Sequence, residues 1–144
     1  MRSSLEAAVS ESNEDVVRRV YEYYNRGDWD RFDGVVGGAY AHHNNSLTLN
    51  LSQFKRGAAW IRAGIPDFRI DIEDMVAGGD KVAVRFVGRG THLGSLYGET
   101  PTSKSIALYG IVIYRVQDGM IAEDWEALDE GDLMKQIGAL PPDA

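Results

Sequence analysis

Apolar residues in the first half of the chain recur with the period of an α-helix. They predict helices over residues 13–26, 28–36 and 52–65, which end at glycines or before a proline. A short strand followed by a polar loop is expected between the second and third helices. The apolar stripe of the first helix consists of Val16, Val17, Val20, Tyr21 and Tyr24.

In the second half, apolar and polar residues alternate, which is typical of β-strands. Residues 68–73 and 81–86 flank a Gly-Gly-Asp turn and predict one hairpin, and residues 106–116 and 120–128 flank a Gln-Asp-Gly turn and predict another. A loop is expected over residues 94–102, and a short helix is expected to close the chain. Helices followed by antiparallel strands indicate an α+β fold.

The composition fits one globular domain and excludes several classes of function. The net charge is −7, from 15 Lys and Arg against 22 Asp and Glu, so no nucleic-acid partner is expected. The absence of cysteine excludes disulfides, thiolate zinc sites and cysteine nucleophiles. No segment resembles a membrane span or a signal peptide, so we expect no membrane association and a cytoplasmic location. We expect a flexible N-terminus over residues 1–12, a domain over residues 13–139 and a tail over residues 140–144.

Several short motifs follow one another in a characteristic order between residues 13 and 139. They include Asn25-Arg26-Gly27-Asp28, His43-Asn44, Ile65-Pro66-Asp67-Phe68, Gly90-Thr91-His92, Asp118-Gly119 and Ile121, Glu123 and Trp125. Together they resemble the SnoaL-like polyketide cyclase and ester cyclase family of the nuclear transport factor two-like superfamily. The resemblance implies a cone-shaped, curved antiparallel sheet that is closed by N-terminal helices and encloses a pocket for a small molecule.

The chain departs from this family pattern at three positions. His42 stands where many members have aspartate, and Asp124 stands where histidine often precedes the tryptophan of the last strand. Val112 replaces an aspartate of the family, so one common pocket carboxylate is missing.

The last predicted strand carries the main candidate for acid–base chemistry. Strict alternation places Glu123 on the same face as Ile121 and Trp125, where a carboxylate is costly to desolvate unless it lines a cavity. Glu123 is therefore predicted to exchange protons with the substrate, together with Asp129 at the mouth of the cone. The alternatives are that Glu123 pairs with an arginine such as Arg85 and that Asp129 caps the closing helix.

Of the three histidines, His43 occupies the family's pocket position and is predicted to orient the substrate or relay a proton. Neighbouring strand residues point to opposite faces, so His42 is not expected beside it. The alternative for His43 is a buried histidine bonded to backbone. No metal-ligand spacing and no nucleotide-binding motif occurs, so neither a metal nor another cofactor is expected.

Aromatic residues are numerous for a domain of this size and suit a flat hydrophobic ligand. For Tyr21 and Tyr24, the alternative is a place in the core. The residues predicted to contact the substrate are Tyr21, Tyr24, Tyr40, Trp60, Tyr109, Trp125, His92 and Arg85.

The leading functional hypothesis is a cofactor-independent enzyme that moves a proton on a hydrophobic carbonyl compound, as in the intramolecular aldol cyclisation of a polyketide ester. The alternatives are a hydrolase or hydroxylase on the same fold, and a protein that binds an apolar ligand without catalysis. Both faces of the strand predicted over residues 106–116 are apolar. This pattern predicts a homodimer joined through the outer face of the sheet.

Overall fold

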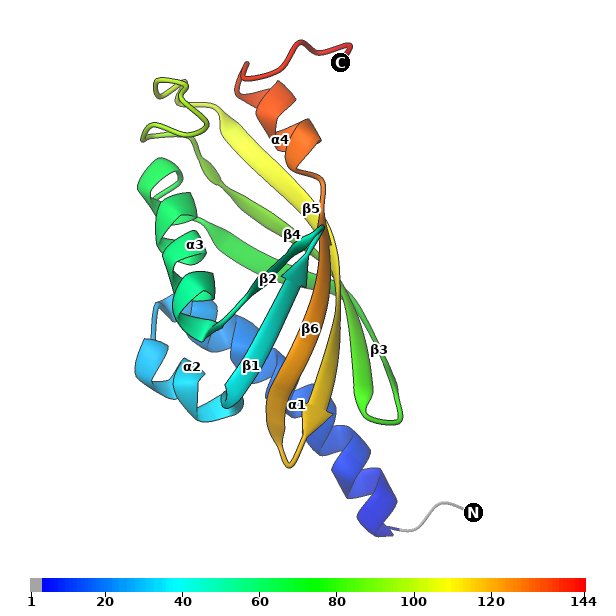
Figure 1. Ribbon diagram of the computed structural model, residues 1–144. Coiled ribbons are helices and arrows are strands. Elements are labelled where there is room, and N and C mark those ends of the chain that lie inside the picture. The colour runs from blue at the N-terminus through cyan, green and yellow to red at the C-terminus, as the bar shows by residue number, and fades with distance from the viewer. Residues whose placement is uncertain (1–3) are drawn as a thin grey trace.

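The computed structural model describes residues 4–144, with side chains from residue 13 onward, and contains four helices and one sheet in that range. The first three helices lie on one face of the sheet, and the fourth follows the last strand at one end of the molecule (Figure 1). The four are α1 (Ser4–Arg26), α2 (Trp29–Val35), α3 (Leu51–Gly64) and α4 (Glu130–Gln136).

Six strands form one curved sheet that does not close into a barrel, in the order β2-β1-β6-β5-β4-β3 (Figure 1). The predicted α+β, cone-shaped architecture with N-terminal helices is confirmed. The strands are β1 (Val36–Asn44), β2 (Leu47–Leu49), β3 (Arg69–Gly78), β4 (Lys81–Thr91), β5 (Ser105–Gln117) and β6 (Met120–Leu128).

One pairing differs from the predicted antiparallel sheet, because β1 and β6 run parallel. A tight turn imposes antiparallel order on the strands that it joins, as it does on β3 with β4 and on β5 with β6. β4 and β5 also run antiparallel, although the longer loop of residues 92–104 joins them. The chain returns from β1 to β6 after four other strands and a helix, so no tight turn fixes their relative direction. As a result, the two strands carry His42 and Asp124 side by side.

Local signals set the bounds of the helices. Asp28 caps α2, and Asn50 begins α3 with a reciprocal pair of hydrogen bonds to Gln53. α1 begins at Ser4 rather than near residue 13. The flexible segment predicted over residues 1–12 falls on residues 1–3, outside those described, and on the first turns of α1, where only the backbone is described.

The two faces of the sheet are most distinct on β5. The inner face, which is turned toward α1 to α3, carries the buried side chains of Leu108, Val112 and Tyr114. The outer face carries the exposed side chains of Ile111 and Ile113. The alternation predicted from the sequence is therefore confirmed, and both faces of this strand are apolar.

A β-bulge interrupts the alternation of β6. Arg115 pairs with Glu123 and the next residue of β5 pairs with Ile121, so Ala122 is an extra residue with no partner of its own. Ile121 and Asp124 consequently both lie on the inner face, where they are buried. The prediction that Ile121 and Glu123 share a face is wrong for this reason.

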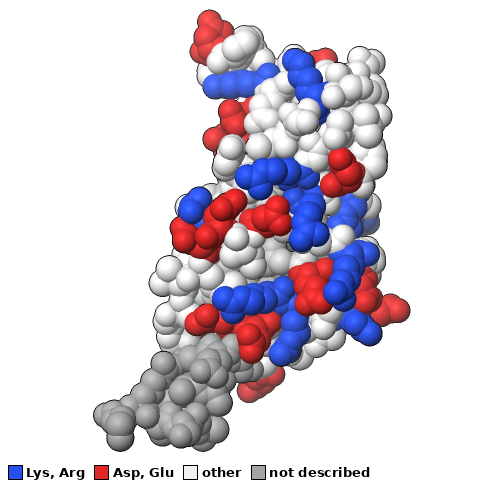
Figure 2. Space-filling view, turned by 180° about the vertical axis from the view of Figure 1, so that it is seen from behind, with Lys and Arg blue, Asp and Glu red and all other residues white. Residues whose placement is uncertain are grey.

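Charged residues of both signs are mixed on the face seen in Figure 2, which is turned away from the viewer of Figure 1. This face therefore presents no extended surface of a single sign. Elsewhere in the described part of the chain, oppositely charged residues pair with each other, as Arg85 does with Asp74 at 2.7 Å and Arg69 with Asp71 at 3.2 Å. Within residues 4–144, no helix is both long and apolar enough to cross a membrane.

Candidate active site

Two adjacent cavities lie between the helices and the inner face of the sheet. The outer cavity, next to α3, has a volume of about 290 Å³, and the inner cavity, which α1, α2 and the sheet line, has a volume of about 40 Å³. They meet at six residues that line both of them: Tyr24, His42, Phe54, Ile70, Phe86 and Glu126.

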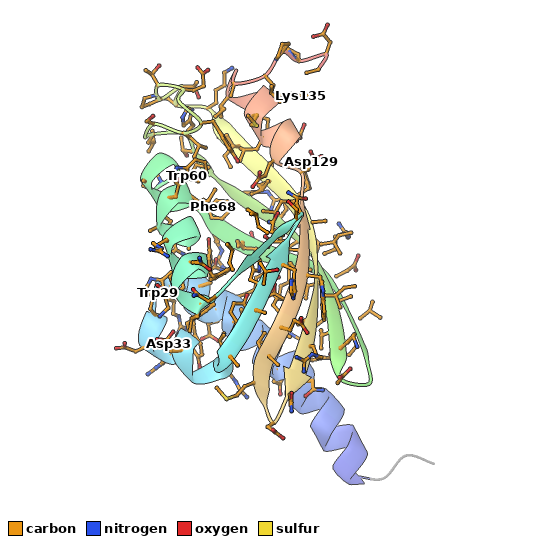
Figure 3. The ribbon with its side chains drawn as sticks, viewed as in Figure 1. Trp29, Asp33, Trp60, Phe68, Asp129 and Lys135 are labelled. Atoms are coloured by element: carbon orange, nitrogen blue, oxygen red, sulfur yellow. The ribbon has the colours of Figure 1, made fainter. Side chains whose placement is uncertain are left out.

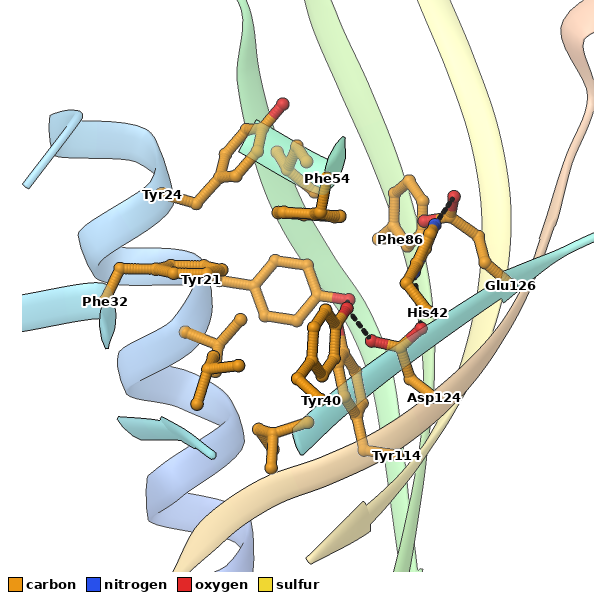
Figure 4. Close-up of a pocket in the computed structure, with 14 residues that line it drawn as sticks. Tyr21, Tyr24, Phe32, Tyr40, His42, Phe54, Phe86, Tyr114, Asp124 and Glu126 are labelled. Carbon is orange, nitrogen blue, oxygen red and sulfur yellow. Dashed lines mark hydrogen bonds and ion pairs between the residues drawn. The ribbon is translucent and has the colours of Figure 1, made fainter. Parts of the chain in front are cut away.

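A buried histidine–aspartate pair lies at this junction (Figure 4). The Nδ1 atom of His42 is 2.5 Å from Oδ1 of Asp124, and the hydroxyl of Tyr40 donates to Oδ2 of Asp124 at 2.5 Å. His42 and Asp124 are only 4% and 3% exposed. Both oxygens of Asp124 are therefore engaged, and the imidazole ring is held in one orientation.

The electrostatics of this pair favour a protonated histidine. Burial alone would lower the pKa of His42, but its contacts with Asp124 and Glu126 outweigh that effect and raise the pKa to about 10. Burial also raises the pKa of Asp124, although His42 and Tyr40 act against this shift. Because two carboxylates surround the ring, His42 is an imidazolium at neutral pH.

Glu126 places a carboxylate beside this imidazolium. Its Oε1 atom lies 3.4 Å from Nε2 of His42 and accepts a hydrogen bond of 3.0 Å from Nδ2 of Asn44. Its side chain is 16% exposed and lines both cavities. Glu126 can therefore reach a ligand in the outer cavity while two neighbours on β1 fix its position.

Tyrosine hydroxyls surround the inner cavity. The hydroxyl oxygens of Tyr21 and Tyr114 are 2.8 Å apart, and both groups are buried. Burial raises the pKa of Tyr21 and of Tyr114 well above the usual value for a phenol. Both hydroxyls therefore stay protonated and remain hydrogen-bond donors.

Four of the predicted substrate-contacting residues line a cavity. Tyr21 and Tyr40 line the inner cavity, Tyr24 lines both, and Trp60 lines the outer one from α3 (Figure 3). Tyr24 also belongs to the buried core. The core alternative and the pocket prediction for Tyr24 are thus compatible, because this core borders the cavities.

Three other predicted residues lie together on the outer face of the sheet. Nε2 of His43 is 2.6 Å from Oε2 of Glu123, and the imidazole ring stacks on Trp125 with 5.5 Å between ring centres. Arg115 also contacts Glu123 at 3.2 Å. The hydrogen bond from His43, followed by that from Arg115, lowers the pKa of Glu123. The alternative that Glu123 pairs with an arginine is confirmed, with Arg115 rather than Arg85 as its partner.

Asp129 and Arg85 make structural contacts outside the cavities. Asp129 caps α4 by accepting a hydrogen bond of 3.0 Å from the backbone of Asp132 (Figure 3), which confirms the capping alternative. Arg85 pairs with Asp74 across β3 and β4. Because Glu123 and Asp129 do not line either cavity, the structure does not bring them together at a common pocket, and their catalytic role stays a prediction.

The two remaining residues that were predicted to contact the substrate are Tyr109 and His92. Tyr109 is 54% exposed on the outer face of β5. His92 is fully buried after β4, where Nδ1 lies 2.9 Å from the hydroxyl of Thr102. Neither residue lines a cavity, so their contact with substrate also stays a prediction.

The sequence reasoning missed Glu126 and His42 as functional candidates. Strict alternation from Ile121 assigned Glu126 to the face opposite the expected pocket, whereas the bulge turns Glu126 inward. The departures from the family pattern at His42 and Asp124 were the signal that could have located the site. Among residues with described side chains, no group of three histidine, aspartate or glutamate residues is placed to hold a metal ion.

The curved sheet, its covering helices and the enclosed cavity with buried polar groups define a protein of the nuclear transport factor two-like class. The family model of the SnoaL-like polyketide cyclases matches residues 14–137, and the chain belongs to this family. No curated protein matches the chain in sequence.

Solved structures of similar proteins support the fold. A candidate hydroxylase, AclR from Streptomyces galilaeus, superposes with a TM-score of 0.85 at 20% identity, over 92% of this chain and 84% of that one. IdmH, a candidate polyketide cyclase from Streptomyces antibioticus, gives 0.82 at 26% identity, over 88% and 98%. A candidate polyketide cyclase from Bacillus cereus gives 0.79 at 27% identity, over 96% and 87%.

Proposed function

We propose that the chain is a cofactor-independent enzyme that moves a proton on a hydrophobic carbonyl compound, as in the intramolecular aldol cyclisation of a polyketide ester. The observation that carries this proposal is the position of Glu126, which lines the junction of the two cavities beside the His42 imidazolium. Membership of the SnoaL-like polyketide cyclase family supports the reaction class.

Glu126 acts as the general base in this proposal. Its carboxylate takes a proton from the carbon next to a carbonyl, which leaves an enolate. The enolate carbon attacks a second carbonyl of the same molecule and forms a carbon–carbon bond. The resulting alkoxide takes the proton back from Glu126, so the base is regenerated and no other reactant is consumed.

The neighbours of Glu126 suit this role. The charge of His42, beside Glu126, offsets the negative charge that moves onto the substrate. Asp124 and Tyr40 hold the imidazole in place, and Asn44 fixes the carboxylate. Because these contacts are already formed, little reorganisation is needed during proton transfer.

The outer cavity suits a hydrophobic ring compound. Its walls are largely apolar, and apart from the Tyr24 phenol its only described charged or titratable side chains are those of His42, Glu126 and Glu130. The aromatic residues of the wall are Tyr24, Phe54, Trp60, Phe68 and Phe86. A flat molecule in contact with these rings would displace water from the reacting carbon.

A matched pair of variants tests the assignment. Acetonaphthone in deuterium oxide serves as the probe, and NMR follows the exchange of its methyl protons. Glu126→Gln is expected to lower the enzyme-catalysed exchange rate at least about a hundredfold, because glutamine cannot accept the proton. Glu123→Gln, on the same strand but the outer face, is expected to leave the rate unchanged. The reverse pattern would return the role to Glu123, and no catalysed exchange by the wild type would contradict the proposal.

We also propose that two copies of the chain associate through the outer face of the sheet. Tyr109, Ile111, Ile113 and Trp125 are 54%, 53%, 40% and 38% exposed on the adjacent strands β5 and β6. Clustered apolar side chains of this size are typical of an interface. Both cavities lie on the inner side of the sheet, so association through the outer face does not cover the residues that line them.

A further inference from the structure

The hydroxyl groups of Tyr21 and Tyr114 are hydrogen-bonded to each other, and only one of their two hydrogens is used in this bond. Their oxygens are 2.8 Å apart, so one hydroxyl donates its hydrogen to the other. Neither hydroxyl makes another hydrogen bond within the described part of the chain. Whichever group donates to the other, the pair keeps one hydrogen that can be given to a ligand.

This hydrogen lies at the wall of the inner cavity, which both tyrosines line. At about 40 Å³, the cavity has room for a single small group, such as one oxygen atom with the carbon that bears it. A buried donor without an acceptor is costly, so a ligand atom that accepts this hydrogen is favoured over an apolar one.

The surrounding polar groups select the kind of atom that fits. Both oxygens of Asp124 already accept hydrogen bonds, from His42 and from Tyr40. An anionic group would face the two carboxylates of Asp124 and Glu126, against the single positive charge of His42, and all three residues line the same cavity. A neutral acceptor without hydrogens of its own therefore matches the cavity best, and a ketone or ester carbonyl is such an acceptor.

We infer that the Tyr21–Tyr114 pair binds the carbonyl oxygen of the substrate in the inner cavity, while the remainder of the substrate occupies the outer cavity. This inference rests on the proposed function and adds the group that activates the carbonyl. The carbon next to the carbonyl then lies at the junction of the cavities, where Glu126 can take its proton. The hydrogen bond draws electron density toward oxygen and stabilises the enolate.

The experiment measures the carbonyl itself rather than turnover. Acetonaphthone labelled with carbon-13 at its carbonyl is bound to the protein, and isotope-edited infrared spectroscopy records the stretching frequency. We expect a shift to lower frequency in the wild type relative to an apolar solvent. The double variant Tyr21→Phe/Tyr114→Phe should lose the shift, because both hydroxyls are removed while the ring volumes are kept.

Single variants guard against a failure of the double variant to fold. After either Tyr21→Phe or Tyr114→Phe alone, the remaining hydroxyl can still donate but is no longer polarised by its partner, so a smaller shift is expected. Tyr23→Phe is the matched control, since Tyr23 lies on the same helix as Tyr21 but lines neither cavity. Its spectrum should match that of the wild type.

Binding affinities give a second readout. The double variant should bind acetonaphthone about two- to tenfold more weakly, the effect of one hydrogen bond. Vinylnaphthalene has no oxygen, and its affinity should not fall. An unshifted carbonyl in the wild type, or a shift lost in Tyr23→Phe but kept in the double variant, would overturn the inference. The proposed function can fail separately, because it predicts loss of proton exchange in Glu126→Gln whatever the carbonyl frequency.

Discussion

The Nδ1 atom of His42 on β1 lies 2.5 Å from Oδ1 of Asp124 on β6, and the two residues are paired neighbours in the parallel part of the sheet. They occupy two of the positions at which the sequence departs from the family pattern, since many members have aspartate at the first and histidine at the second. Compared with those members, the imidazole and the carboxylate have exchanged strands, so this contact still joins one imidazole to one carboxylate. The two departures therefore compensate each other.

The first prediction concerns this exchange. His42→Asp alone places two carboxylates together, and Asp124→His alone removes the partner of a buried cation. Each is expected to lower the free energy of unfolding by about 3–5 kcal/mol. The double variant restores an acid and an imidazole, so it should recover at least half of the summed loss. Urea denaturation measures all four proteins, and additive losses in the double variant would count against the compensation.

The second prediction is the dependence of stability on pH. The pKa of His42 rises from 6.5 to about 10 in the folded protein, so the folded state holds this proton more tightly than the unfolded state does. The stabilisation is complete below pH 6.5 and is lost as the pH rises through 10. Each unit of pKa difference corresponds to about 1.4 kcal/mol.

The variant His42→Gln provides the comparison. Its free energy of unfolding should change less than that of the wild type between pH 6.5 and pH 10. The pKa of Asp124 is also raised, so its contribution to the free energy of unfolding also falls as the pH rises. This loss begins at acidic pH and does not mask the effect of His42. Parallel curves for the two proteins over the alkaline range would show that His42 does not hold the proton.

Much of the fold could be predicted because it is encoded in local periodicity. The helices α2 and α3 and the two hairpins follow from apolar spacing, turn residues and caps that need no knowledge of distant contacts. The strands β1 and β6 are far apart in the sequence, so their parallel pairing depends on the path of the chain between them. The spacing of residues within either strand does not indicate their relative direction.

The site was harder to predict, because one extra residue decides which carboxylate faces the cavity. Ala122 shifts the register of β6, so Asp124 and Glu126 turn inward and Glu123 turns outward. A bulge changes the hydrogen bonding of the backbone without a distinctive local sequence. Tyr21, Tyr24, Tyr40 and Trp60 were selected for their aromatic character and do line a cavity, but the same criterion also selected Tyr109 and Trp125, which lie on the outer face of the sheet.

The third prediction is that catalysis survives removal of metal ions. The proposed proton transfer uses protein groups, with Glu126 as the base and His42 beside it, and both are held by neighbouring side chains. After treatment with EDTA and dialysis, the rate of deuterium exchange into acetonaphthone should remain within about twofold of the untreated rate. Loss of exchange that a single metal restores would mean that a Lewis acid takes part in the reaction.

The fourth prediction concerns the proposed dimer. Light scattering at micromolar concentration should give about twice the mass of one chain, and a wild-type monomer would contradict the proposal. Ile111→Glu introduces a charge at the centre of the exposed apolar strip on β5 and should yield a monomer, because an unpaired carboxylate is costly to bury. Val76→Glu is the matched control, since Val76 is 70% exposed on the edge strand β3. If Ile111→Glu remains a dimer while Val76→Glu dissociates, the interface lies along β3, and the stacked pair of His43 and Trp125 faces solvent instead of a second copy.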